Sequence, residues 1–232
     1  MKIVVVQSGP DYDVFPLMSL LIGLHKNFSD AQVTWIGNRS MFDLVRFNRR
    51  VQRSIPIHET DSLDSLKSFF GADLLINPSR DKAALRVAAS VGANKVCGFT
   101  QSGPADRNAE FFDKIVSGKL KTNRHVLDLY YSLVDLRWKG EGYGLPYYPK
   151  TKQTKGVGCY LAEEQSFRMP DRLLAKLDAI NEYSEIVTDD LFICHAAIAL
   201  RKKVTLAADH LPYQICFFGR GSVQKSEPQE PQ

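Results

Sequence analysis

The sequence opens with MKIVVVQSGPDYDVFPLMSLL, residues 1–21, and this stretch decides the fold. Ile3 to Val6 is a continuous β-branched run, which is typical of a strand buried on both faces of a sheet. Gly9 and Pro10 end that strand. A helical pattern follows, with its apolar face formed by Val14, Leu17, Met18, Leu21 and Ile22. A buried strand, a tight loop and a helix that opens on a carboxylate predict an α/β sheet with Asp13 at its mouth.

Asp13 has two interpretations at this point. Aspartate is a preferred residue at a helix N-cap, where its oxygens accept hydrogen bonds from the free backbone N–H groups of the first turn. A carboxylate at the carboxyl end of the first strand could instead act as a general base. Spacing alone favours the cap.

Composition limits the classes of function. The 232 residues suit one large domain or two small ones, and 44% hydrophobic residues are enough to build a core without disulfides. The net charge of +4 is mild and comes with no nucleic-acid motif. Such a charge suits a negatively charged substrate or a peripheral approach to an anionic membrane, and we expect no nucleic-acid partner.

The cysteines, histidines and N-terminus predict a cytoplasmic protein without a metal or cofactor. Cys97, Cys159, Cys194 and Cys216 form no CxxC pair, which is typical of free thiols in a reducing compartment. The five histidines lack the spacing of metal ligands. Neither a signal peptide nor a run of eighteen apolar residues is present, so we expect no membrane-spanning helix.

Strands and helices alternate along the first two thirds of the chain, which predicts a parallel sheet covered on both faces. We expect strands at 32–36, 51–57, 73–76 and 95–99. We expect helices capped by Ser40, by Asp61 or Ser62, and by Asp81, and two more at 109–116 and 123–139. The polar stretch 101–108 between them reads as a mobile loop.

A second α/β unit follows a stretch rich in glycine, proline and tyrosine. We expect strands at 157–161, 185–188 and 203–207, with one helix that has Pro170 in its first turn and another capped by Asp189 or Asp190. The polar residues 222–232 should be disordered. Two such units predict a bilobal protein whose ligands bind in the cleft, at the carboxyl ends of the strands.

Several stretches together resemble glycosyltransferase family nine, the ADP-heptose:lipopolysaccharide heptosyltransferases. The opening 1–21 is similar to the family's first strand, glycine-bearing loop, Asp and helix, and residues 31–36 and 72–78 to two further strands. Residues 123–133 (NRHVLDLYYSL) are similar to a family helix that begins with a basic residue and His. Residues 188–200 (TDDLFICHAAIAL) resemble the donor-lobe signature, in which Asp is followed five residues later by His.

The resemblance implies the GT-B architecture of two Rossmann-like lobes with parallel sheets. The second lobe of this chain is reduced, since it is about one β-α-β unit shorter than the family's. It implies an N-terminal acceptor lobe at 1–145, a linker at 146–155, a reduced C-terminal lobe at 156–219 and a tail at 220–232. Asp13 falls where the family keeps its proposed catalytic base. Asp190 and His195 fall on the donor side.

Departures from the family pattern concentrate where a diphosphate would bind. Gln7 stands where the family usually has a basic residue, and Tyr12 stands where it favours glycine. Leu191 and Phe192 replace a Thr-Gly or Ser-Gly pair, whose small side chains let backbone N–H groups approach a diphosphate at a helix N-terminus. In SFRMP, residues 166–170, Phe167 and Met169 stand for the family's Lys and Trp.

The remaining candidate residues keep two interpretations each. Arg168 could replace the missing donor-side cation, as could Arg201 or Lys202, although a solvated surface role is favoured for all three. His195 either faces the donor or forms a hydrogen bond between the lobes. Arg80 and Arg107 could contact the acceptor, and ordinary exposure is the alternative for both.

Two hypotheses of different classes follow. The first is a heptosyltransferase-like, inverting glycosyltransferase that uses a nucleotide sugar, such as ADP-heptose, and a glycan or glycolipid acceptor in cell-envelope glycan assembly. Its work would be cytoplasmic and peripheral at the inner membrane face. The second is a catalytically inactive homologue that acts as a scaffold or regulator, bound to a protein partner or to a second copy of itself. The retained Asp13 favours the first and the altered diphosphate site the second.

Overall fold

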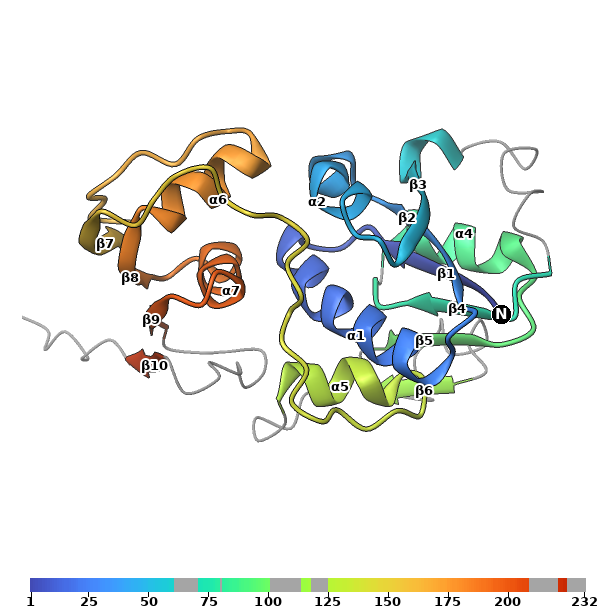
Figure 1. The fold of residues 1–232 in the computed structure, drawn as a ribbon. Helices are drawn as coiled ribbons and strands as arrows, with labels where there is room; N and C mark the ends of the chain where they lie inside the picture. The colour runs from blue at the N-terminus through green and yellow to red at the C-terminus, as the bar shows by residue number, and fades with distance from the viewer. Residues whose placement is uncertain (61–70, 80, 101–113, 118–124, 209–220, 225–232) are drawn as a thin grey trace, which may run out of the picture.

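The computed structural model of the protein contains two parallel sheets joined by an irregular segment (Figure 1). The structure describes residues 1–60, 71–79, 81–100, 114–117, 125–208 and 221–224. Every strand pair in the described residues is parallel, as the alternation of strands and helices predicts. Two parallel sheets in one chain confirm the expected α/β fold class.

The first sheet is built around β1. Its spatial order is β3 (Val51–Pro56), β2 (Gln32–Gly37), β1 (Lys2–Gln7), β4 (Leu74–Asn77), β5 (Val96–Thr100) and β6 (Lys114–Ser117). Residues 3–7 of β1 are all buried, because β1 lies between β2 and β4 and is covered on both faces. Pro56 ends the edge strand β3, where a missing N–H costs no hydrogen bond within the sheet.

The helices of this half cover the two faces unequally. They are η1 (Asp11–Asp13), α1 (Val14–Asn27), η2 (Arg39–Met41), α2 (Phe42–Arg46), η3 (Ile57–Thr60), α4 (Lys82–Val91) and α5 (Val126–Ser132). The apolar side chains of α1, α2 and α5 join one face of the sheet in the larger hydrophobic cluster. Those of α4 form a smaller cluster on the opposite face. The carboxyl ends of β1, β2 and β4 therefore share one polar edge between the two layers.

The second sheet has the order β10 (Gly221–Gln224), β9 (Lys203–Ala207), β8 (Tyr183–Thr188) and β7 (Lys155–Tyr160). Its helices α6 (Leu173–Asn181) and α7 (Leu191–Ala199) lie on the side that faces the first sheet (Figure 1). Within the described residues, no helix is long and apolar enough to cross a bilayer.

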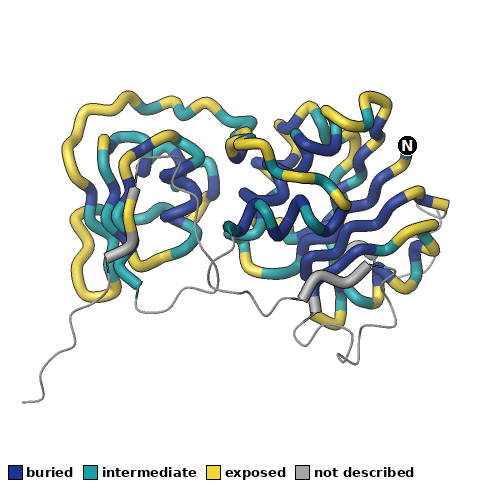
Figure 2. Tube along the Cα trace, turned by 90° about the horizontal axis from the view of Figure 1, so that it is seen from below, coloured by how far each residue is buried: buried dark blue, intermediate teal, exposed yellow. Residues whose placement is uncertain are grey.

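The larger hydrophobic cluster continues from the first sheet into the second. It includes Phe15 and Leu17 of α1 together with Leu177 of α6 and Ile193 and Ala197 of α7. Figure 2 shows buried segments on the facing sides of both halves. The smaller half thus shares a core with the larger one, which offsets the limited core that so few residues can build alone.

Two sequence predictions in the first half are wrong in their extent. Residues 114–116, expected at the end of a helix, lie in β6 and pair with β5, where the β-branched Ile115 and Val116 suit a strand. The helix expected over 123–139 is seen only as α5. It ends because Asp135 has a φ of 60° and the N–H of Leu136 donates back to the carbonyl of Tyr131.

Three further predictions differ from the structure in the caps and the tail. Ser40 does not cap α2, since its hydroxyl donates to Asp11 instead. Pro170 precedes α6, whose N-cap is Arg172. Residues 222–224, expected to be disordered, lie in β10 and pair with β9. The helix expected from residue 61 or 62, the loop 101–108 and the segment 225–232 lie outside the described residues.

Candidate functional site

The first candidate group is Asp13, at the end of the short 3-10 turn that joins β1 to α1. Its backbone is helical (φ −64°, ψ −17°), and its N–H donates to the carbonyl of Pro10 at 3.0 Å. The side chain makes no capping hydrogen bond to the helix, although spacing favoured that role. It is partly exposed at the carboxyl edge of the first sheet. The carboxylate is therefore not engaged in holding the helix end.

The loop before Asp13 is held by its own polar contacts. Gln7 is fully buried, and its Nε2 donates to the carbonyls of Gly9 at 3.0 Å and Pro10 at 3.2 Å. Ser79, after β4, accepts the N–H groups of Ser8 at 2.8 Å and Gly9 at 3.0 Å on its Oγ. Gln7 thus fixes the loop, and the loop amides are already bonded within the protein.

Gly9 is placed where a larger residue would displace the Asp13 carboxylate. A Cβ at position 9 would lie 2.9 Å from Oδ2 of Asp13 and 3.5 Å from Oγ of Ser79. The first distance is shorter than ordinary van der Waals contact. A side chain at position 9 would therefore push the carboxylate aside, because the loop backbone passes directly against it.

The second candidate group is Asp190, in the corresponding corner of the second sheet. It is the N-cap of α7, in an extended backbone conformation, and its Oδ1 accepts from the N–H of Ile193 at 2.9 Å. Its own N–H donates to the hydroxyl of Thr188 at 3.0 Å. This confirms that one of the two aspartates caps the helix.

The two residues after Asp190, which begin α7, are bulky and apolar. Leu191 and Phe192 are partly buried against the core. The ring of Phe192 lies 5.6 Å from that of Phe15 in α1, centroid to centroid, and the Nζ of Lys176 lies 5.4 Å from its centre. An aromatic contact thus joins the two halves beside the first turn of α7.

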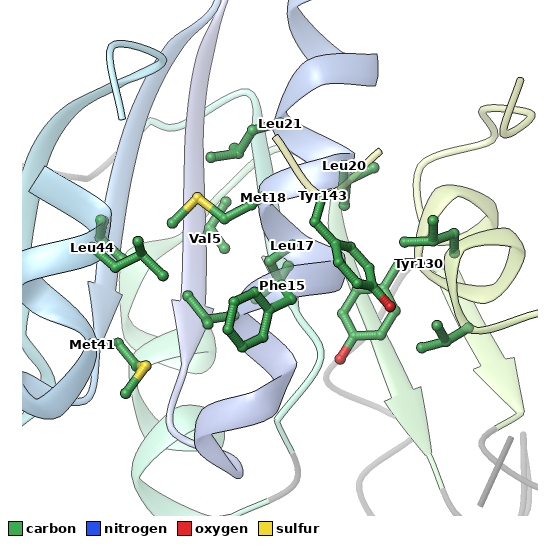
Figure 3. Packing of buried hydrophobic residues seen from close by; sticks show 14 of the residues in the cluster. Val5, Phe15, Leu17, Met18, Leu20, Leu21, Met41, Leu44, Tyr130 and Tyr143 are labelled. Atoms are coloured by element: carbon green, nitrogen blue, oxygen red, sulfur yellow. The ribbon is translucent and has the colours of Figure 1, made fainter. Parts of the chain in front are cut away.

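His195 lies one helical turn further along α7 and has no exposed surface. Its Nδ1 lies 2.6 Å from the Oη of Tyr143, and its ring stacks beside Phe15 and Tyr12 at 6.2 Å from each. Figure 3 shows Tyr143 and Phe15 side by side in this cluster. Burial lowers the pKa of His195 to about 3, so the imidazole is neutral at neutral pH. This hydrogen bond ties α7 to the segment that joins the two halves.

The basic candidates are less well placed. Arg168 is exposed in the segment after β7, on the same edge of the second sheet as Asp190. Arg80 and Arg107 lie outside the described residues. Within the described part of the chain, no three His, Cys, Asp or Glu side chains gather in a way that could hold a metal ion.

The two corners meet in space. Tyr12 of η1 contacts His195 of α7, and Phe15 of α1 contacts Phe192. The carboxyl edges of the two parallel sheets therefore face each other, with Asp13 on one side and Asp190 on the other. This is the edge at which α/β sheets bind their ligands.

Known structures share this fold. The Escherichia coli ADP-heptose lipopolysaccharide heptosyltransferase II superposes with a TM-score of 0.72 at 12% identity, over 99% of this chain and 92% of the other. A glycosyltransferase of family 9 from Veillonella parvula gives 0.71 at 14%, over 99% and 88%. The E. coli heptosyltransferase WaaC, solved with ADP, gives 0.67 at 11%, over 93% and 90%.

Sequence comparison alone finds no such likeness, since neither a protein-family model nor a curated protein sequence matches the chain. At these identities, the structural likeness establishes the fold. The chain has the GT-B fold of two Rossmann-like lobes. The resemblance to the ADP-heptose heptosyltransferases, first seen in short motifs, is thus confirmed across nearly the whole chain at the level of architecture.

Two residues of the site were missed by sequence reasoning. Ser79, two residues after β4, accepts hydrogen bonds from the loop that contains Gly9. The sequence marks Ser79 only by its position shortly after a predicted strand, which does not reveal this contact. Tyr143 lies in the segment between the lobes and is 2% exposed. A tyrosine between two glycines reads as an exposed loop residue, so the burial of Tyr143 could not be foreseen.

Proposed function

We propose that the chain is a heptosyltransferase-like glycosyltransferase of cell-envelope glycan assembly that transfers a sugar slowly from a nucleotide donor. Asp13 is the general base that deprotonates the acceptor hydroxyl. The proposal is carried by one observation: on a GT-B fold, the Asp13 carboxylate stands partly exposed at the cleft edge and makes no capping bond. The work belongs at the cytoplasmic face of the inner membrane.

The other groups have supporting roles in this proposal. Asp190 and Arg168 line the donor side, and His195 positions α7 through Tyr143 rather than meeting the nucleotide. Arg80 and Arg107 contact a glycan or glycolipid acceptor. Slow transfer follows from Leu191 and Phe192, because losing one preorganised donor to developing charge costs about 3 kcal/mol of barrier.

The first test is binding. ADP-heptose, UDP-glucose and GDP-mannose are titrated while the melting temperature is recorded. A nucleotide at tenfold excess over Kd should stabilise the fold by about 1.4 kcal/mol, which is visible as a thermal shift. No shift with any of the three would refute nucleotide-sugar binding and with it the transferase.

The second test is turnover with the nucleotide sugar that binds. Asp13→Asn should lower the rate at least about a hundredfold while the thermal shift persists, because the amide cannot accept the proton. Asp11→Asn is the matched control, since Asp11 lies in the same turn and bonds the Ser40 hydroxyl at 2.9 Å. Equal rates for the wild type and Asp13→Asn would remove Asp13 from catalysis.

The second candidate function is an inactive homologue that serves as a scaffold or regulator. The contact between Phe192 and Phe15 favours it, because it ties the first turn of α7 to the other lobe. This hypothesis predicts no nucleotide shift, together with co-purification of a partner or self-association. A monodisperse monomer that captures no partner in a pull-down would contradict it.

A further inference from the structure

A cavity of about 680 Å³ lies at the other end of α7, away from Asp190. It opens between residues 140–149, which join the two lobes, and residues 198–202, where α7 ends. Its walls include Leu145, Tyr147, Tyr148, Ile198, Leu200 and Lys202. The volume is that of a small-molecule site. Because the cavity is at the carboxyl end of α7, it is separate from the candidate sugar site.

Lys202 is a buried cation in the wall of this cavity. The residue is 6% exposed, and its Nζ donates to the Oε1 of Gln153 at 3.1 Å and to the carbonyl of Asn181 at 2.9 Å. Both acceptors are neutral, and they use two of the three N–H groups of the ammonium. Within the described residues, no carboxylate pairs with Lys202.

A buried charge without a counter-charge is costly, and the titration of Lys202 reflects that cost. Desolvation lowers the pKa of Lys202 from its ordinary value, with no acid to oppose it. Replacing one water-facing ammonium by a buried one costs several kcal/mol unless a partner anion compensates. The described chain supplies two dipoles and no anion. An anionic group placed in the cavity would complete the site.

The turn that directs Lys202 inward carries a second cost. Arg201 has a φ of 60°, and the N–H of Lys202 donates to the carbonyl of Ala197 at 2.9 Å, which closes α7 in a left-handed turn. Glycine is usual at such a position, because a side chain there crowds the backbone. The chain thus keeps an arginine in a strained position beside the buried lysine, and both line the cavity.

The remaining walls are apolar or aromatic. Ile198, Leu200 and Leu145 supply aliphatic surface, and Tyr148 is 90% exposed at the cavity's edge. An aromatic ring held in solvent has nothing to pack on within its own fold, and it offers a face to the body of a ligand. A buried lysine in the cavity wall and apolar walls around it fit a molecule with one acidic group and a ring.

We propose that this linker cavity binds a small organic phosphate, with the phosphate on Lys202 and Arg201 and a ring or carbon body against Tyr148 and Leu200. Phosphate suits the site because lysine meets it as a point charge, while the arginine adds further N–H donors. The cavity is separate from the proposed sugar-transfer residues, since Asp13, Asp190 and Arg168 do not line it. Arg201 and Lys202 therefore lie away from the donor side on which the sequence also placed them as candidates. Tyr143, the partner of His195, is the one described residue that touches both regions.

The proposal is tested with three probes: phenyl phosphate, inorganic phosphate and phenol. Their binding to the full chain is measured by calorimetry and by NMR chemical shift changes. Phenyl phosphate should bind at least about tenfold more tightly than inorganic phosphate, because the walls add apolar contact. Phenol, which lacks the charge, should bind more weakly than phenyl phosphate. No binding of phenyl phosphate at millimolar concentration would overturn the proposal.

Variants distinguish binding in this cavity from nonspecific attraction of phosphate to basic side chains. Lys202→Met should weaken phenyl phosphate at least about tenfold, whereas Lys203→Met, its neighbour paired with Glu185 at 3.0 Å, should leave the affinity unchanged. Equal loss in both variants would overturn the site. Tyr148→Ala changes only an exposed side chain, so the fold is retained. It should weaken phenyl phosphate and spare inorganic phosphate, and an unchanged ratio of the two affinities would also count against the proposal.

Discussion

The two lobes have the same local structure at their facing edges: a strand, a short turn and a helix that starts near an aspartate. The two aspartates differ in what their side chains bond. Asp190 has an extended backbone and bonds the N–H of Ile193, so its carboxylate holds α7. Asp13 has a helical backbone and no such bond, since a 3-10 turn begins α1 before it. The difference shows that position at a strand end does not by itself decide a carboxylate's role.

The residues around the two aspartates also differ. Around Asp13 the loop is polar and internally bonded by Gln7 and Ser79. Around Asp190 the next residues are bulky and apolar, and Phe192 reaches across to the other lobe. One corner thus holds an aspartate that does not cap its helix, while the aspartate of the other corner caps α7 and the residue Phe192 contacts the other lobe. The same fold accommodates both kinds of corner. The fold alone therefore does not decide whether the chain has transferase activity.

The largest expected effect comes from reopening the second corner. Replacing Leu191 by Thr and Phe192 by Gly removes the aromatic contact with Phe15 and bares the N–H groups of α7. ADP affinity, measured by calorimetry, should rise at least tenfold, while the free energy of unfolding falls by about 3 kcal/mol.

Phe167→Ala is the matched control for that double variant. Phe167 is also a partly buried aromatic residue of the second lobe, and its ring lies 4.8 Å from that of Tyr183, away from the α7 N-terminus. It should cost stability and leave ADP affinity unchanged. If the double variant gains no affinity over the control, the aromatic side chains are not what separates the two corners.

Eight of the ten described strands are predicted from the sequence because their signal is local, and β6 and β10 are the two that were missed. Residues 3–6 are β-branched and continuous, and β1 forms where expected. Asp81 caps α4 as predicted, with Oδ1 3.0 Å from the N–H groups of Ala83 and Ala84. A β-branched run and a cap can be read within a few residues, so neither depends on knowing the rest of the fold.

The relation between the lobes could not be predicted, because it depends on contacts between distant residues. His195 meets Tyr143 across 52 positions, and Ser79 meets Gly9 across 70. The end of α5 was missed for a related reason, since Leu133 and Leu136 continue the helical spacing while Asp135 leaves the helical conformation. Periodicity reports which residues are apolar, and it does not report where the backbone turns.

The next largest effect is a pH dependence of stability that comes from the buried His195. The pKa of His195 is lowered to about 3, against 6.5 in the unfolded chain, so the unfolded state binds the extra proton between these values. Stability is therefore complete above pH 6.5 and is lost as pH falls toward 3. Between pH 7 and pH 5 the loss should be about 2 kcal/mol, measured by urea unfolding.

His195→Gln separates this titration from the acid sensitivity of the whole protein. The amide does not titrate and can still hydrogen-bond the Tyr143 hydroxyl. The variant should lose about 2 kcal/mol less than the wild type over the same pH range. If both proteins have the same pH profile, the histidine is not held neutral between the lobes.

A smaller effect is expected at the first corner. Gly9→Ala places a Cβ 2.9 Å from the Asp13 carboxylate, which must then move by a few tenths of an ångström. Sugar transfer should fall about tenfold, because a displaced base loses its alignment with the acceptor hydroxyl. Gly156→Ala is the control, since a Cβ there meets nothing within 4 Å. Equal activity in the two variants would show that Asp13 need not be held by the loop.

The smallest effect tests the two aspartates directly by stability. Asp190→Ala removes the hydrogen bond to the N–H of Ile193 and should cost about 1 kcal/mol of unfolding free energy. Asp13→Ala removes no capping bond and should cost less than half as much. Denaturant unfolding at one pH measures both. Equal losses would mean that Asp13 supports its helix as Asp190 does, and the argument that the first carboxylate is kept for chemistry would fail.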